Sequence, residues 1–253
     1  MRSTLIMSEP DYPRYRIGFF RGGSPRSLPE IGQRASRWLR GLGEWEPALR
    51  TWFHTARSLK ASLAKPVDMS PEALTDYLTR TFERHHREVS IHTWVDLWVW
   101  TPLPELGKGR GVGTNFCMGV LEASEFDSCL LSLTPEGPTA QRLLQTGKLI
   151  ELCALAARTW DLNYGWIVPD EYADRMPEAL QQHKDPTGWM IYLSRRRGRI
   201  PPLPAPARVV PVDDLGSIVV VTEEPFRPDN PDHVERADRI FDLLDHAGLM
   251  DSR

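Results

Sequence analysis

Hydrophobic residues in the last third of the chain form two short runs that predict buried strands. In residues 188–193 and 216–222, apolar side chains occupy both the odd and the even positions. A strand that is apolar on both faces is covered on both sides, so each run is predicted to be an interior strand of a sheet. These two strands are expected to lie in the core.

A helix is predicted directly after them. Asn230 can cap its first turn, Pro231 suits the first helical position, and Gly248 fits a left-handed cap at the end. Between these signals apolar residues recur at helical spacing: Val234, Ala237, Ile240, Phe241 and Leu244. Burial stabilises such a face by roughly 1.5–3 kcal/mol per large side chain, so the helix is expected to pack on the sheet.

The same patterns assign most of the remaining chain. Further strands are predicted at 15–20, 51–54, 94–100, 113–121, 128–133 and 164–168, and helices at 27–43, 70–82 and 139–159, with a short helix around 177–182. Strands outnumber helices and do not alternate with them strictly. This order predicts an α+β fold with a mostly antiparallel or mixed sheet, several packing helices, and a C-terminal strand followed by a helix. We expect one domain over residues 1–253, with room for two lobes on one sheet.

The strand at 94–100 has two different faces. Its aliphatic residues alternate with Trp94, Asp96, Trp98 and Trp100, so these four share one side. That side is either a second core layer or a surface that a partner covers, because tryptophan is enriched at binding hot spots. Large buried aromatic residues are common, which favours the core layer.

Composition and charge limit the class of protein. The chain is 41% hydrophobic and 26% charged, as is usual for a soluble protein, and it has no long apolar run that would cross a membrane or form a signal peptide. Its three cysteines show no metal spacing, which fits a cytoplasmic protein. Residues 1–65 carry 12 Lys/Arg against 5 Asp/Glu, whereas residues 213–253 carry 11 acids against 4 arginines. An acidic surface repels nucleic acid and favours basic protein partners, although a solvated helix face has the same composition.

The motifs that resemble catalytic sites lack the required context. The glycine-rich stretch 107–113 lies between two predicted strands and does not open a helix, so a hairpin loop is expected. His85 and His86 are adjacent near a helix end and diverge, which fits the helix dipole better than a metal. The arginines of 195–199 are expected in an exposed loop. We therefore predict no catalytic residue, no cofactor and no metal.

Several stretches resemble the immunity protein 52 family of bacterial polymorphic toxin systems. The resemblance is carried by Gly188-Trp189-Met190 with Tyr192-Leu193, Gly216 to Thr222, Glu223-Glu224-Pro225-Phe226, Asn230-Pro231 and Ala247-Gly248-Leu249. Gly18, Arg21, Trp38-Leu39, Trp52 and Leu97-Trp98 follow the same order in the first half, whereas residues 105–135 match nothing in the pattern.

The resemblance implies an α+β protein that inhibits a cognate secreted toxin stoichiometrically and is not an enzyme. Such toxins often carry a restriction-endonuclease-like nuclease domain. The residues that we expect to bind the toxin are Trp94, Asp96, Trp98, Trp100, Asp170, Glu171, Asp174, Asp213, Asp214, Glu223 and Glu224. We expect no nucleic acid or membrane partner. The rival hypotheses are an enzyme or small-ligand protein with Asp96, His92 and nearby tryptophans around a pocket, and a scaffold module.

Overall fold

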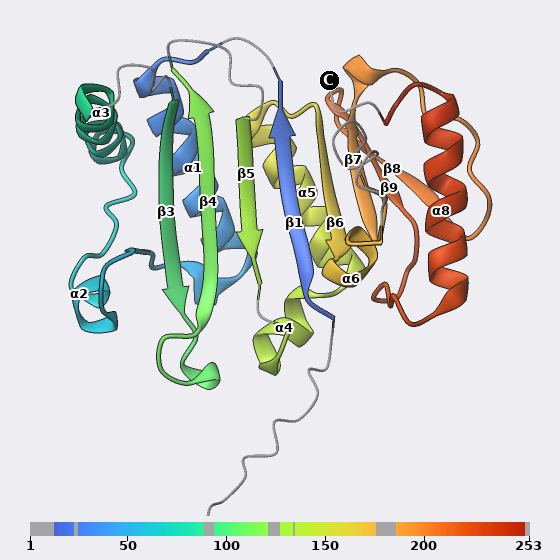
Figure 1. Ribbon diagram of the computed structural model, residues 1–253, viewed down its shortest axis with the longest axis horizontal. Helices are drawn as coiled ribbons and strands as arrows, with labels where there is room; N and C mark the ends of the chain where they lie inside the picture. Colours follow the sequence, from blue (N-terminus) through green and yellow to red (C-terminus); the bar gives the residue numbers. More distant parts are fainter. Residues whose placement is uncertain are drawn as a thin grey trace, which may run out of the picture.

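A computed structural model describes residues 13–22, 25–88, 94–120, 127–133, 135–175 and 186–250. Within these residues, nine strands form one antiparallel sheet (Figure 1). The strands are β1 (Tyr15–Arg21), β2 (Phe53–His54), β3 (Trp94–Pro102), β4 (Gly111–Gly119), β5 (Asp127–Ser132), β6 (Tyr164–Pro169), β7 (Met190–Ser194), β8 (Arg208–Val212) and β9 (Gly216–Val220). Their order across the sheet is β2-β3-β4-β5-β1-β6-β7-β9-β8. The first strand of the chain therefore lies in the middle of the sheet.

Seven α-helices accompany the sheet in the described part of the chain. They are α1 (Leu28–Trp45), α2 (Leu59–Leu63), α3 (Pro71–Glu88), α4 (Gly137–Leu143), α5 (Thr146–Trp160), α6 (Asp170–Ala173) and α8 (Pro231–His246), with short 3-10 turns at Pro47–Leu49, Pro104–Leu106 and Arg195–Arg197. The predicted α+β class with an antiparallel sheet and a C-terminal strand followed by a helix is confirmed. None of these helices is both long and apolar enough to cross a lipid bilayer.

Helices α1 and α5 lie behind the sheet in the view of Figure 1. The indole Nε1 of Trp38 on α1 donates a hydrogen bond to Thr114 Oγ1 of β4 at 3.1 Å. From α5, the ring of Trp160 lies 5.1 Å from that of Phe116 on β4. These contacts bury one face of the central strands under two helices.

Helix α8 packs at the other end of the sheet, beside β7, β9 and β8 (Figure 1). Every residue of β7 is buried, and so are Ile218, Val219 and Val220 of β9. The two runs predicted as interior strands therefore do have both faces covered. Asn230 caps the helix by accepting a hydrogen bond from the Asp232 backbone N–H at 3.0 Å, as predicted.

One predicted helix needs correction, and some elements were missed. The predicted helix at 139–159 is two helices, because the backbone at Leu144 (φ −84°, ψ 53°) leaves the helical region and Gln145 starts α5 anew. Strand β8 and helix α2 were not predicted. Strand β8 contains Pro211, and proline argues against a strand in the interior of a sheet. At an edge it is tolerated, because no neighbouring strand needs its N–H. The predicted helix around 177–182 and the connection between the predicted strands 113–121 and 128–133 lie outside the described residues, apart from Asp127.

Candidate partner-binding face

The tryptophan side of β3 is exposed. Trp98 is 55% exposed and Trp94 40%, while the alternate residues Val95, Leu97 and Val99 are buried. The core layer favoured by the sequence is therefore wrong. The tryptophans are exposed because α1 and α5 pack on the aliphatic side of the sheet, and no described helix covers the tryptophan side.

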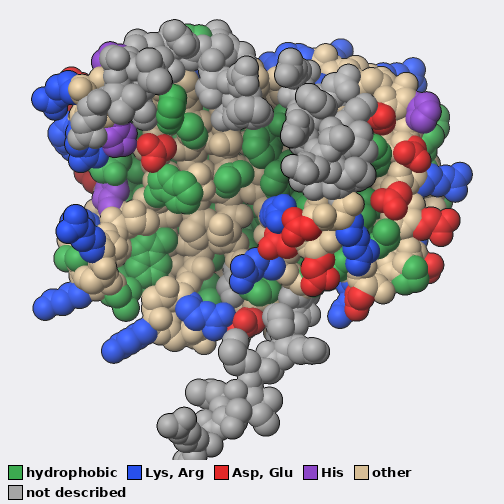
Figure 2. All heavy atoms as spheres, viewed as in Figure 1, with side chains coloured by type: hydrophobic (Ala, Val, Ile, Leu, Met, Phe, Trp, Pro, Cys, Tyr) green, Lys and Arg blue, Asp and Glu red, His purple; other side chains and the backbone are tan. Residues whose placement is uncertain are grey.

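The exposed side continues across four further strands. In the register of the sheet, Trp98 lies opposite Asn115 of β4, which lies opposite Leu130 of β5; Gly18 of β1 then connects Leu130 to Trp166 of β6. We call this surface the tryptophan face; it consists of Trp94, Asp96, Trp98, Trp100, Asn115, Cys117, Ser128, Leu130, Phe20 and Trp166. All ten are exposed or half-buried. Figure 2 views this side, where hydrophobic side chains gather over β3 to β5 with few charges among them.

Aromatic rings contact one another in the middle of this face. The Phe20 ring is 5.3 Å from that of Trp166 and stacks on Tyr164 at 4.9 Å. A Cβ atom at Gly18 would lie only 2.6 Å from the Phe20 ring and 2.9 Å from that of Trp166, so the rings rest directly on the backbone there. The surface is consequently broad and shallow.

Trp100 is held more tightly than its neighbours on β3. Its Nε1 donates a hydrogen bond to Ser62 Oγ of α2 at 2.5 Å, and its ring is 6.4 Å from that of Phe53. Trp100 is therefore half-buried at the edge of the sheet, whereas Trp94 and Trp98 present more of their rings to solvent.

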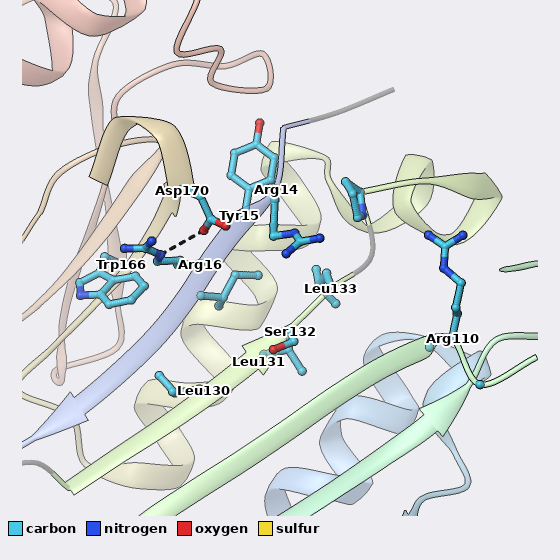
Figure 3. A pocket seen from close by; sticks show the side chains of 14 residues that line it. Arg14, Tyr15, Arg16, Arg110, Leu130, Leu131, Ser132, Leu133, Trp166 and Asp170 are labelled. Atoms are coloured by element: carbon cyan, nitrogen blue, oxygen red, sulfur yellow. Dashed lines mark ion pairs between the residues drawn. The ribbon is translucent and has the colours of Figure 1, made fainter. Parts of the chain in front are cut away.

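A groove of about 570 Å³ opens at the end of the face where β1 begins and β5 ends (Figure 3). We call it the arginine groove, because Arg14, Arg16 and Arg110 line it together with a single carboxylate, Asp170. Leu130 and Trp166 belong to both the groove and the tryptophan face. The two therefore form one continuous surface.

Apart from Asp96, the predicted acidic residues are not collected beside the tryptophans. Asp170 lines the groove, and both Asp170 and Asp174 bind Arg16, at 3.1 and 2.8 Å. The pair Asp213 and Asp214 lies between β8 and β9, at the opposite end of the sheet from β3.

Three of the acidic candidates away from the face, Asp213, Glu223 and Glu224, have partners within the chain. Asp213 pairs with Arg158 at 2.7 Å, which lowers the pKa of its carboxyl. Glu223 pairs with Arg208, and Glu224 lies 2.9 Å from His233 Nε2. Glu171 is exposed on α6, and Asp96 is half-buried between Trp94 and Trp98.

Cys117 on the tryptophan face and His54, which lies on the opposite side of the sheet, both have shifted pKa values. Burial, with the nearby carboxylates of Asp96 and Asp127, raises the pKa of Cys117 to about 11, so its thiol stays protonated at neutral pH. Burial and the positive charge of Lys65 lower the pKa of His54, whose ring stacks on Tyr77 at 4.4 Å. Among the described residues, no group of three His, Cys, Asp or Glu side chains is placed to hold a metal ion.

The basic run at 195–199 is not simply an exposed loop. Arg196 donates to Asp161 Oδ1 at 2.8 Å and to the Leu162 carbonyl at 3.1 Å. Arg197 donates to the Leu249 carbonyl at 2.6 Å and lies over the Tyr164 ring at 4.6 Å. Two arginines of the basic run therefore connect the sheet to the residues after α5 and to the C-terminal segment.

Sequence reasoning missed the arginine groove and the part of the face on β1 and β5. The excess of Lys and Arg in residues 1–65 was the available signal, since it includes Arg14 and Arg16. Arg110 could not be associated with them, because only the sheet order brings the β3–β4 connection close to the start of β1.

Comparison with known proteins agrees with this architecture. The Pseudomonas aeruginosa T6SS protein PA0821 shares the fold, with a TM-score of 0.51 over 93% of this chain and 75% of its own, at 13% sequence identity. No curated protein shows significant sequence similarity to the chain. The family model of immunity protein 52 matches residues 14–253. The chain therefore belongs to the immunity protein 52 family.

Proposed function

We propose that this protein neutralises a cognate secreted toxin by binding it directly in a one-to-one complex. The observation that supports this most is the family match over residues 14–253, because immunity proteins protect the cell that makes the toxin. The structural neighbour is described as a T6SS protein, which supports delivery of the toxin by a type VI secretion system. The protein would act in the cytoplasm, on a nuclease toxin of the restriction-endonuclease fold.

The tryptophan face is the surface that we assign to the toxin. A stable interface buries roughly 800 Å² on each partner and depends on a few aromatic or arginine anchors. Trp98 and Trp94 are exposed large aromatic residues on a rigid strand, and Phe20, Leu130 and Trp166 extend the apolar area around them. A rigid aromatic side chain loses little conformational entropy on binding, so its burial contributes efficiently to affinity.

We propose that the protein has no catalytic activity. Cys117, the thiol on the exposed face, has a raised pKa because burial and the carboxylates of Asp96 and Asp127 disfavour its thiolate form, which is the nucleophile. The face is shallow, whereas a small-molecule site usually encloses most of its ligand. These features favour inhibition by occupation of a surface.

The experiment is to test rescue and binding with the toxin encoded by the adjacent gene. Co-expression should restore growth to cells that make the toxin, and the purified proteins should elute from a sizing column as one complex in which toxin activity is lost. A catalytically inactive toxin variant should bind equally well, which separates binding from damage to the host. Absence of both rescue and complex would contradict the proposal.

A further inference from the structure

The arginine groove has an excess of positive charge that is only partly neutralised by carboxylates of the chain itself. Its lining contains three arginines and one aspartate. Arg14 is exposed and forms no ion pair with any described residue. Arg16 is already shared between Asp170 and Asp174. Arg14 is thus the cation most available to an incoming acidic group.

Arg110 can also accept a further partner. It pairs with Glu136 at 3.1 Å, but both side chains are well exposed, at 50% and 36%. Exposed pairs of this kind contribute little to stability, and a guanidinium has five N–H donors. A second carboxylate can therefore bind Arg110 without first breaking a strong interaction.

The groove and the apolar face would be covered by the same partner. Leu130 and Trp166 belong to both surfaces, and Figure 3 shows Arg16 beside Trp166, with Arg14 farther along the groove toward Leu133. An apolar centre with charged groups at its rim is the usual anatomy of a protein–protein interface. The charge at this rim is positive, so the complementary surface is negative.

We propose that the toxin places a carboxylate-bearing loop in the arginine groove while an apolar patch of the toxin covers the tryptophan face. This rests on the proposed function, because it specifies the chemistry of the toxin surface. A cleft that binds nucleic-acid phosphates is basic and would be repelled by Arg14 and Arg110. The toxin is therefore held by an acidic surface beside such a cleft, and substrate is excluded by bulk.

The test is charge reversal in the groove, with a matched reversal elsewhere. Arg14→Glu and Arg110→Glu are compared with Arg239→Glu, which alters an exposed arginine on α8 at the other end of the sheet. Affinity for the cognate toxin is measured by calorimetry and surface plasmon resonance at low and high salt. Thermal unfolding of each variant confirms that it folds.

We expect each groove reversal to weaken binding by about 10-fold or more at low salt, mainly through slower association, and the difference to shrink at high salt. Arg239→Glu should bind within twofold of wild type. A toxin variant in which one surface Asp or Glu becomes Lys should restore binding to Arg14→Glu. This restoration would identify the carboxylate that enters the groove.

Two results would overturn the inference and leave the proposed function intact. In the first, wild type binds the toxin but both groove reversals bind equally tightly. In the second, the free protein is a dimer in sedimentation experiments and Arg14→Glu dissociates it, which would assign the groove to a second copy of this chain. Failure of wild type itself to bind the toxin would instead contradict the proposed function.

Discussion

Truncation of Trp98 tests the tryptophan face most directly. The side chain is 55% exposed at the centre of β3, so a partner that covers it would remove slightly more than half of its surface from water. Tryptophan buries up to about 250 Å² when fully covered, so the newly buried part is roughly 140 Å². At about 25 cal/mol per Å² this is worth roughly 3.5 kcal/mol, of which Trp98→Ala would lose about 2–3 kcal/mol.

Trp98→Ala should weaken binding to the toxin but change the free energy of unfolding only slightly. A change of 2–3 kcal/mol corresponds to about a 30- to 150-fold rise in the dissociation constant. Because the ring is largely outside the core, the free energy of unfolding should fall by no more than about 1 kcal/mol, reflecting the lower strand preference of alanine. Isothermal titration calorimetry with the toxin and urea unfolding of the free protein measure the two quantities separately.

Val209→Ala is the matched control. Val209 is also an exposed apolar residue on a strand, 42% exposed, but it lies on β8 at the opposite edge of the sheet. Its truncation should leave toxin affinity within twofold of wild type. If Trp98→Ala binds as tightly as wild type, the toxin does not cover this face and the reasoning from exposed aromatics fails.

Three further predictions concern the stability of the fold. Asp127→Ala removes the carboxylate that binds the buried Arg21 at 2.9 Å, and should lower the free energy of unfolding by about 3–5 kcal/mol in urea titrations; a loss below 1 kcal/mol would show that the pair is dispensable. Asn230→Ala removes the cap of α8 and should cost about 1 kcal/mol by the same measurement, with an unchanged midpoint contradicting the prediction. The folded-state pKa of His54 is lowered by burial and by Lys65, so the unfolded chain binds a proton more readily. The free energy of unfolding should therefore be highest above the pKa of His54 in the unfolded chain, about 6.5, and should decline as the pH falls below it. His54→Phe should lose this part of the pH dependence. An identical slope of unfolding free energy against pH in the variant would refute the prediction.

Much of the fold could be predicted because its signals are local. The two doubly apolar strands, the cap at Asn230 and the divided faces of 94–100 depend only on neighbouring residues, and all were placed correctly. The break at Leu144 was missed although the non-apolar stretch Gln145-Thr146-Gly147-Lys148 follows it, because one exposed turn of a continuous helix can have the same composition. Strand β8 was missed because Pro211 is incompatible with a central strand. Only the sheet order shows that β8 lies at an edge, where proline is tolerated.

The candidate face was only half predictable for a different reason. The sequence grouped Trp94, Asp96, Trp98 and Trp100 correctly by alternation, but the choice between core and surface depends on how many helices cover the sheet and on which side. The acidic residues of 213–253 suggested a partner surface, yet Asp213 and Glu223 are bound to arginines of this chain. Ion pairs between residues far apart in sequence cannot be read from composition.

The central position of β1 has a consequence for synthesis on the ribosome. Arg21 pairs with Asp127 and Tyr15 pairs with Pro169, so the strand that emerges first waits for more than a hundred residues before either neighbour is available. Contacts of such long range form slowly, and an unpaired apolar strand is prone to aggregate in the meantime. The nascent chain should therefore depend on chaperones until β6 has left the exit tunnel, and truncation before residue 164 should yield insoluble protein.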